Sequence, residues 1–187
     1  MVYNERRRSS PALFAGIVAG LGGAAAIVGA VLPWISTTGE GGRIGISGLG
    51  SITGSQLGGS NLNDLIAIGG VGSYRPGLVG LVAGIITVLL GIGIVLAAAG
   101  GVRGSRPWRW VSLPLLLLGV LTAGWGLWRT FAPGTAAGVL AAGDAAAGAG
   151  PVVSAIGGVL MLVAGGWLLS GRADPAPVTR RSAGIQR

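Results

Sequence analysis

The chain has 187 residues, of which 51% are hydrophobic and only 10% are charged, and its mean hydropathy is +0.75. Soluble domains carry charge on about a quarter of their residues, so this composition excludes an ordinary soluble domain and indicates a polytopic membrane protein. The sequence has no Cys and no His, which excludes thiol catalysis, disulfides and the commonest zinc ligands; all 13 basic residues are Arg, and the net charge is +8.

Long apolar segments predict the architecture. A bilayer core about 30 Å thick requires about 20 apolar residues in a helix. Four segments meet this requirement without Asp, Glu or Arg in their interiors: about 12–32, 77–100, 110–128 and 151–170. Their continuous runs lack the alternation of a membrane β-barrel. We therefore expect an all-α membrane protein, a four-helix transmembrane bundle over residues 12–170, with a cytoplasmic N-terminal segment 1–11 and a disordered cytoplasmic tail 171–187.

The first span has alternative interpretations. Arg6–Arg8 and the apolar run containing Ala24–Ala26 resemble a cleaved signal peptide or a twin-arginine signal, but the run of about 21 residues exceeds the usual h-region of about 7–15. Within the same run, Gly20–Ala25 spells a dinucleotide-binding fingerprint, with Glu40 about 20 residues later. That fingerprint requires a preceding strand, whereas here it lies inside a membrane span. We therefore expect a retained transmembrane helix.

The arginines predict the orientation. Ten of them lie in the N-terminal segment, the connection of residues 101–109 and the C-terminal tail, whereas Arg43, Arg75 and Arg129 lie on the other side. The positive-inside rule then places both termini in the cytoplasm of a bacterial plasma membrane. The arginines are dispersed rather than gathered in an aromatic-interleaved stripe, so we expect contact with the lipid bilayer and no nucleic-acid partner.

The tryptophans are predicted to be interface anchors, because amphipathic rings prefer the headgroup level of a bilayer. The predicted anchors are Trp34, Trp108, Trp110, Trp125, Trp128 and Trp167. A ligand-binding aromatic cage is the functional alternative.

The first outer loop, residues 33–76, is the longest segment outside the predicted membrane, with 44 residues. Gly39–Gly42 predicts a turn, the alternation in Arg43–Ser47 predicts a strand, and Ile52-Thr53 is its expected partner. Asn61–Ile68 predicts a short helix with an Asn cap. We expect a small cap of strands and helix; a flexible glycine-rich loop is the alternative.

Two further connections carry expectations. The second outer loop, residues 129–150, is rich in Ala and Gly and is predicted to form one short interfacial helix. The inner connection is short, which predicts that the spans at 77–100 and 110–128 are antiparallel neighbours.

Small residues recur at helix-packing spacing in every span. They let helix backbones approach closely, which is how membrane helices associate without a hydrophobic driving force. The predicted packing residues are Gly16, Gly20, Gly77, Gly80, Gly84, Gly91, Gly119, Gly126, Gly158 and Gly165. We expect packing within one bundle, with a homo-oligomer or partner interface as the alternative.

Few side chains can carry chemistry. The acidic residues are Glu5, Glu40, Asp64, Asp144 and Asp174. No two share an evident helix face, so we predict no catalytic residue, no metal site and no cofactor. An enzyme would require Glu40, Arg43 and Asp64 to converge in the first outer loop, where a structural ion pair is the expected use.

The spans contain few polar side chains, and we considered Thr87, Ser112 and Thr122. A transporter or channel usually has a polar or ionisable residue at mid-membrane, whereas Ser and Thr commonly bond to their own helix backbone. We therefore expect a non-enzymatic accessory or scaffold subunit of a membrane complex. It would contact a membrane-protein partner or a second copy through the outer loop or a glycine face. A small transporter or channel-like protein is the first alternative and a membrane-bound enzyme the second.

Two short motifs carry a resemblance. Leu32-Pro33-Trp34 closes the first span, and Ser47-Gly48-Leu49 follows in the outer loop. With the Ala-, Gly- and Arg-rich composition, they resemble small four-span actinobacterial membrane proteins, mostly uncharacterised, and more weakly the tryptophan-operon-associated membrane protein family. The resemblance implies four spans and no known activity. The loop order is also similar to that of claudins, but their paired cysteines and W-GLW-C-C signature are absent here.

Overall fold

A computed structural model describes residues 10–39, 42–54, 59–69, 73–100, 105–133 and 146–170. The long helices are α1 (Ser10–Val31), α3 (Leu78–Ala99), α4 (Ser105–Phe131) and α5 (Ala149–Leu169). The short elements are β1 (Pro33–Gly39), β2 (Gly42–Ser47), β3 (Ile52–Thr53), α2 (Leu62–Gly69) and β4 (Ala146–Ala147).

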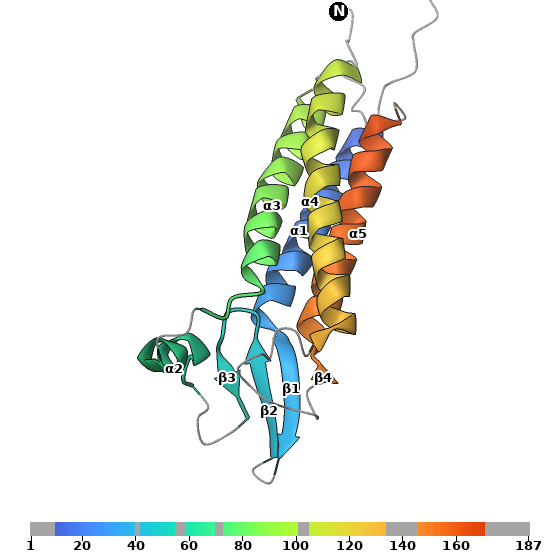
Figure 1. Cartoon of the computed structure of the whole chain (residues 1–187). Coiled ribbons are helices and arrows are strands. Elements are labelled where there is room, and N and C mark those ends of the chain that lie inside the picture. Colours follow the sequence, from blue (N-terminus) through green and yellow to red (C-terminus); the bar gives the residue numbers. More distant parts are fainter. Residues whose placement is uncertain are drawn as a thin grey trace, which may run out of the picture.

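The four long helices confirm the predicted all-α membrane bundle. Each is long and apolar enough to cross a membrane, over Pro11–Val31, Leu78–Ala99, Trp108–Phe131 and Ala149–Leu169. The chain is therefore a multi-pass membrane protein. The helices alternate in direction, so that the start of α1 and the end of α5 lie at one end of the bundle and the sheet lies at the other (Figure 1). We call these the far end and the sheet end.

The helices pack in the order α3, α1, α5, α4. Helix α1 contacts both α3 and α5 extensively, and α5 also contacts α4, whereas contacts between α3 and α4 are sparse. The second and third spans are antiparallel, as predicted, but they contact each other only sparsely. A short connection brings the ends of two helices together, but close packing along their length also requires surfaces that fit, and the small residues lie on the other interfaces.

The sheet has four antiparallel strands in the order β3-β2-β1-β4. Ile35 pairs with Ile46, and Ile46 pairs with Ile52, so these three side chains share one face of the sheet. All three are buried. One face of the sheet therefore carries three adjacent buried isoleucines.

The strand predicted at Arg43–Ser47, its partner Ile52-Thr53 and the helix predicted after Asn61 are all present, as β2, β3 and α2. Strand β1 was not predicted, and it follows α1 with Leu32 as the only intervening residue. The short helix predicted for the second outer loop falls mostly on residues 134–145, which lie outside the described part; at the described end of that loop, Ala146–Ala147 forms strand β4. Residues 1–9 of the predicted N-terminal segment 1–11 and the whole predicted tail 171–187 also lie outside it, whereas Ser10 and Pro11 belong to α1.

Candidate functional site at the sheet end

Glycines on α1 and α3 bring the backbones of these two helices into close contact. A β-carbon on Gly23 would lie 2.7 Å from the carbonyl oxygen of Gly84, and one on Gly84 would lie equally close to that of Gly23. One heptad away, a β-carbon on Gly16 would lie 3.0 Å from the Gly91 oxygen, and one on Gly91 would lie 2.8 Å from the Gly16 oxygen. Any side chain at these positions would push the helices apart.

The interface of α1 with α5 repeats this arrangement with glycines that the sequence analysis did not single out. A β-carbon on Gly22 would lie 2.9 Å from the Gly157 oxygen, and one on Gly157 would lie 2.6 Å from the Gly22 oxygen. The second pair, Gly29 and Gly150, again lies one heptad away, with β-carbon positions 2.9 and 2.8 Å from the partner's oxygen. Two adjacent faces of α1 are therefore glycine-lined, one for each neighbour.

Nine of the ten predicted packing glycines have another part of the chain within 4 Å of the place that a β-carbon would take. Gly20 is the exception, but its backbone nitrogen would lie 2.9 Å from a β-carbon on Gly91. Gly119, Gly126, Gly158 and Gly165 form the contact between α4 and α5. These glycines are thus occupied within one chain, as packing of a single bundle predicts.

Trp34 fastens the sheet to the bundle. Its indole N–H donates to the carbonyl oxygen of Gly29 across 2.8 Å, and its side chain is 2% exposed. The ring lies against Gly48 and Gly150, where a β-carbon would collide with it. On the opposite side of the strand, Gly148 donates its N–H to the Trp34 oxygen at 3.0 Å. One residue therefore joins α1, β1 and the segment that leads into α5.

Asn63 connects α2 to two other segments. Its amide nitrogen donates to the Leu49 oxygen at 3.1 Å, and its amide oxygen accepts from the backbone N–H of Tyr74 at 2.7 Å. The Asn61 side chain accepts from the N–H of Asn63 at 2.9 Å, as the predicted cap requires. This network fixes α2 between the β2–β3 connection and the segment that enters α3.

The six tryptophans separate into three groups by exposure. Trp110 is 75% exposed, and Trp128 and Trp167 are also exposed, which suits the predicted interface anchors. Trp34 and Trp108 are buried, so these two rings contact protein and the prediction does not hold for them. Trp125 is half-buried and donates its indole N–H to the Pro76 oxygen at 2.7 Å.

Trp125 and Trp128 hold an arginine. Their ring centroids lie 5.2 Å apart at an interplanar angle of 63°, and the guanidinium carbon of Arg129 lies 4.7 and 5.0 Å from them. The sequence analysis assigned Arg129 to the second outer loop, but it lies in the last turn of α4. This pair of rings therefore contacts the chain's own cation, and a ligand-binding aromatic cage stays a prediction.

Three polar atoms of Arg129 and Tyr74 lack hydrogen-bond partners in the part of the chain that the structure describes. Nε and Nη1 of Arg129 and the hydroxyl of Tyr74 are buried and have no hydrogen-bond partner. Burial raises the pKa of Tyr74 to about 12, although the nearby Arg129 charge acts to lower it. The tyrosine therefore stays neutral at physiological pH and does not neutralise Arg129. Three donor atoms on two side chains, together with one positive charge, therefore have no acceptor among the described residues.

Of the acidic residues, the structure describes only Asp64, which does not pair with Arg43. Arg43 directs its Nη2 toward the Ser36 hydroxyl at 3.5 Å, and no ion pair joins it to Asp64, which is exposed on α2. Glu40 lies outside the described residues. The convergence that an enzyme would need is therefore not seen among the residues described.

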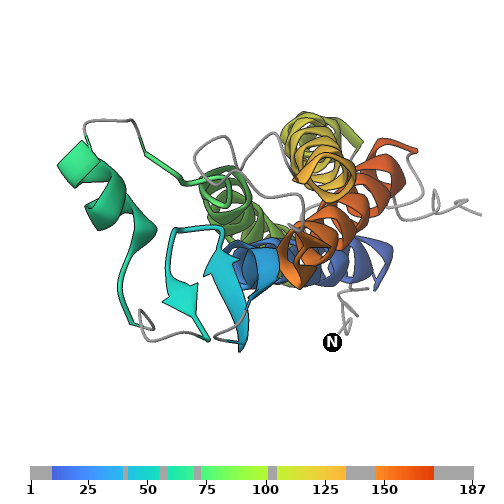
Figure 2. The same ribbon diagram turned by 60° about the horizontal axis from the view of Figure 1, so that its bottom comes forward.

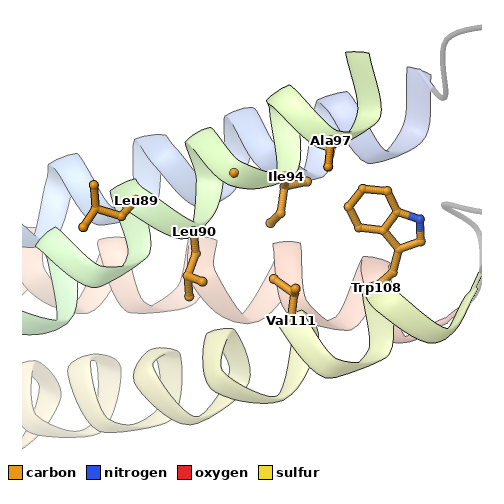
Figure 3. A pocket seen from close by; sticks show the side chains of 7 residues that line it. Leu89, Leu90, Ile94, Ala97, Trp108 and Val111 are labelled. Carbon is orange, nitrogen blue, oxygen red and sulfur yellow. The ribbon is translucent and has the colours of Figure 1, made fainter. Parts of the chain in front are cut away.

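The space between α3 and α4 is an open apolar groove of about 190 Å³. Leu89, Leu90, Ile94 and Ala97 of α3 face Trp108 and Val111 of α4 across it (Figure 3). Nothing lies within 4 Å of the β-carbon position of Gly93, and the buried indole N–H of Trp108 has no partner. Sparse contact between α3 and α4 leaves this groove open.

The cluster of Tyr74, Trp125, Trp128 and Arg129 is the site that sequence reasoning missed. The available signal was the spacing, because Trp125 and Arg129 are four residues apart and must lie on one face of a helix. The second signal was a single arginine after a membrane span, with no acidic residue near it in sequence.

The chain matches no known protein-family model and none of the curated proteins.

Proposed function

We propose that the chain is an accessory or scaffold subunit of a membrane complex and that it recognises its partner through the surface formed by the sheet and α2. The main support for this proposal is that the surface is attached to the helix bundle at several points. Trp34, Gly148 and Asn63 each bond to a second segment, and Gly77 donates its N–H to the Gly48 oxygen at 2.8 Å. A surface held at several points keeps its shape before a partner arrives, which lowers the cost of binding.

We propose that helix α2 provides the central contact between this surface and the partner protein. Ile66 is buried, whereas Ile68 is 86% exposed. Helix α2 has eight residues and lies well to one side of the helix bundle (Figure 2). It is too short to span a bilayer. An apolar side chain in this position is suited to burial by a partner protein.

The interior of the bundle favours this proposal over transport. The Thr87 hydroxyl bonds to the sulfur of Met161 at 3.4 Å, and the Ser112 hydroxyl bonds to the Arg109 oxygen at 2.7 Å. The first bond joins α3 to α5 and the second lies within α4, so these two hydroxyls are satisfied inside the bundle.

We further propose that both termini are cytoplasmic and that the sheet lies on the outer side of a bacterial plasma membrane, because ten arginines flank the far end. The sequence has no native Cys, so single cysteines report topology cleanly. In intact cells, a membrane-impermeant thiol reagent should label Ser73→Cys and leave Ser182→Cys unlabelled. Labelling of Ser182→Cys alone would reverse the orientation.

The partner proposal is tested by gentle-detergent purification of the tagged chain from its native membrane. We expect one protein to co-purify in a fixed ratio with the wild type and to be lost with Ile68→Asp. Trp110→Ala is the control, because it removes an exposed apolar side chain at the far end. Equal retention by both variants, or a solitary wild-type chain, would contradict the proposal.

A further inference from the structure

The edge of the bundle at the sheet end holds a positive charge that no described side chain neutralises. Arg129 lies beside Trp125 and Trp128, and the structure shows no ion pair for it among the described residues. Arginine remains protonated at any physiological pH. Contact with two aromatic faces stabilises the cation, but it supplies no acceptor for the guanidinium N–H groups.

Tyr74 adds a second donor to the same place. Its hydroxyl is buried without a partner, and Tyr74 lies two residues before Pro76, whose carbonyl oxygen accepts from the indole N–H of Trp125, the ring that contacts Arg129. A buried donor that is left unpaired is destabilising. A negatively charged oxygen acceptor would therefore satisfy both the hydroxyl of Tyr74 and the guanidinium of Arg129.

The position of the cluster indicates the kind of acceptor. Arg129 lies in the last turn of a helix that is apolar enough to cross a membrane, and that helix ends at Phe131. Trp128 is 50% exposed and Phe131 is 83% exposed, so apolar rings face outward on either side of the charge. Tryptophan rings are typical of the headgroup level of a bilayer, where phosphate is the abundant oxyanion.

We propose that Arg129 and Tyr74 bind a phosphate oxyanion, and that a phospholipid headgroup supplies it. The guanidinium provides charge-assisted hydrogen bonds to the phosphate, and the tyrosine hydroxyl provides a neutral one. The exposed rings of Trp128 and Phe131 contact the glycerol and upper acyl region of the same lipid. The inference is independent of any protein partner of the sheet.

The experiment measures ligand binding to the full chain, purified in a detergent without phosphate, by native mass spectrometry and by thermal stabilisation. The probes are phosphatidylglycerol, a diacylglycerol with the same acyl chains, and inorganic phosphate. The variants are Arg129→Gln, Arg129→Lys and Tyr74→Phe. Arg109→Gln is the matched control, since Arg109 is an exposed arginine near the other end of the same helix.

We expect phosphatidylglycerol to bind and to stabilise the wild type and Arg109→Gln, and diacylglycerol to have no such effect. Arg129→Gln should weaken binding by at least about tenfold, and Tyr74→Phe by about two- to tenfold. Arg129→Lys should lie between the wild type and Arg129→Gln, because it keeps the charge and loses the planar donor set. If Arg129→Gln does not fold, the graded losses in Arg129→Lys and Tyr74→Phe decide the matter.

Three outcomes would overturn the proposal. Equal binding of phosphatidylglycerol by the wild type and by all three site variants would remove the site. Equal stabilisation by inorganic phosphate and by phosphatidylglycerol would assign the site to free phosphate and overturn the lipid source. A co-purifying protein that is lost with Arg129→Gln, with no phospholipid effect, would show that a partner carboxylate occupies the site.

Discussion

The indole N–H of Trp34 is bonded to the carbonyl oxygen of Gly29, 2.8 Å away, and this bond completes the end of α1. The last four carbonyl groups of a helix have no partner within the helix, and Gly29 belongs to that group because α1 ends at Val31. A side chain from the first strand therefore terminates the first membrane helix. The same side chain forms part of the contact between the sheet and α5.

Replacing Trp34 should loosen the joint between the sheet and the bundle. Trp34→Phe removes the hydrogen bond while keeping most of the ring, and we expect a loss of about 1 kcal/mol of unfolding free energy. Trp34→Ala also leaves a cavity, which raises the loss to about 3–5 kcal/mol. The unfolding free energy is measured by titrating the purified chain with a denaturing detergent. Trp110→Phe, at a ring that is 75% exposed, is the control and should change little; similar losses in both phenylalanine variants would contradict the role of Trp34.

A methyl group at Gly84 should separate α1 from α3. Its carbon would lie 2.7 Å from the backbone oxygen of Gly23, which cannot move without shifting the helix. We expect Gly84→Ala to cost about 1–3 kcal/mol, as overpacking does. Gly93→Ala, on the same helix with nothing within 4 Å of its β-carbon position, should be neutral or slightly stabilising. Thermal unfolding of the two variants compares them directly, and a Gly84→Ala variant as stable as Gly93→Ala would refute the close packing.

Thr122 and Thr130 form a matched pair on α4. The Thr122 hydroxyl is buried without a partner, whereas the Thr130 hydroxyl donates to the Gly126 oxygen at 2.8 Å. Because an unpaired buried hydroxyl is unfavourable, Thr122→Val should keep or raise the unfolding free energy. Thr130→Val should lower it by about 0.5–1.5 kcal/mol. The opposite order, measured by the same unfolding titration, would contradict the bonding described for this helix.

The sequence predicted the membrane helices and much of the sheet because those elements have local signals. Apolar runs define the spans, alternation defines β2, and the Asn residues define the start of α2. Strand β4 has no such signal, since Ala146 and Ala147 are ordinary helix formers that become a strand only by pairing with Ser36 and Ile35. Its pairing is a tertiary effect.

The order of the helices and the candidate site were harder to predict. A short connection suggested that α3 packs on α4, but the glycines of α1 allow closer approach than the larger residues that α3 and α4 present to each other. Tyr74 and Arg129 are 55 positions apart in sequence and meet only after the helices pack. Burial and missing hydrogen bonds, which mark the site, are properties of the fold.

Tyr74 provides a pH-dependent test of its buried environment. Burial raises its pKa from the ordinary 10.0 to about 12. Between these values the folded chain holds the proton and the unfolded chain has lost it, so the contribution of Tyr74 to stability is complete below pH 10 and is lost as the pH rises toward 12. The sequence contains two tyrosines, so Tyr3→Phe leaves Tyr74 as the sole chromophore for an ultraviolet titration of tyrosinate. Ionisation near pH 10 would show that the ring is open to water.

The central claim, that the surface of the sheet and α2 receives a protein partner, is tested most directly by photo-cross-linking in intact cells. A photoreactive amino acid is placed at Ile68 and, as a control, at Leu117, an exposed apolar residue of membrane helix α4. We expect the probe at Ile68 to capture one protein of defined mass and the probe at Leu117 to yield no such product. A probe at Ile68 that captures no protein, or the same adducts from both positions, would contradict the claim.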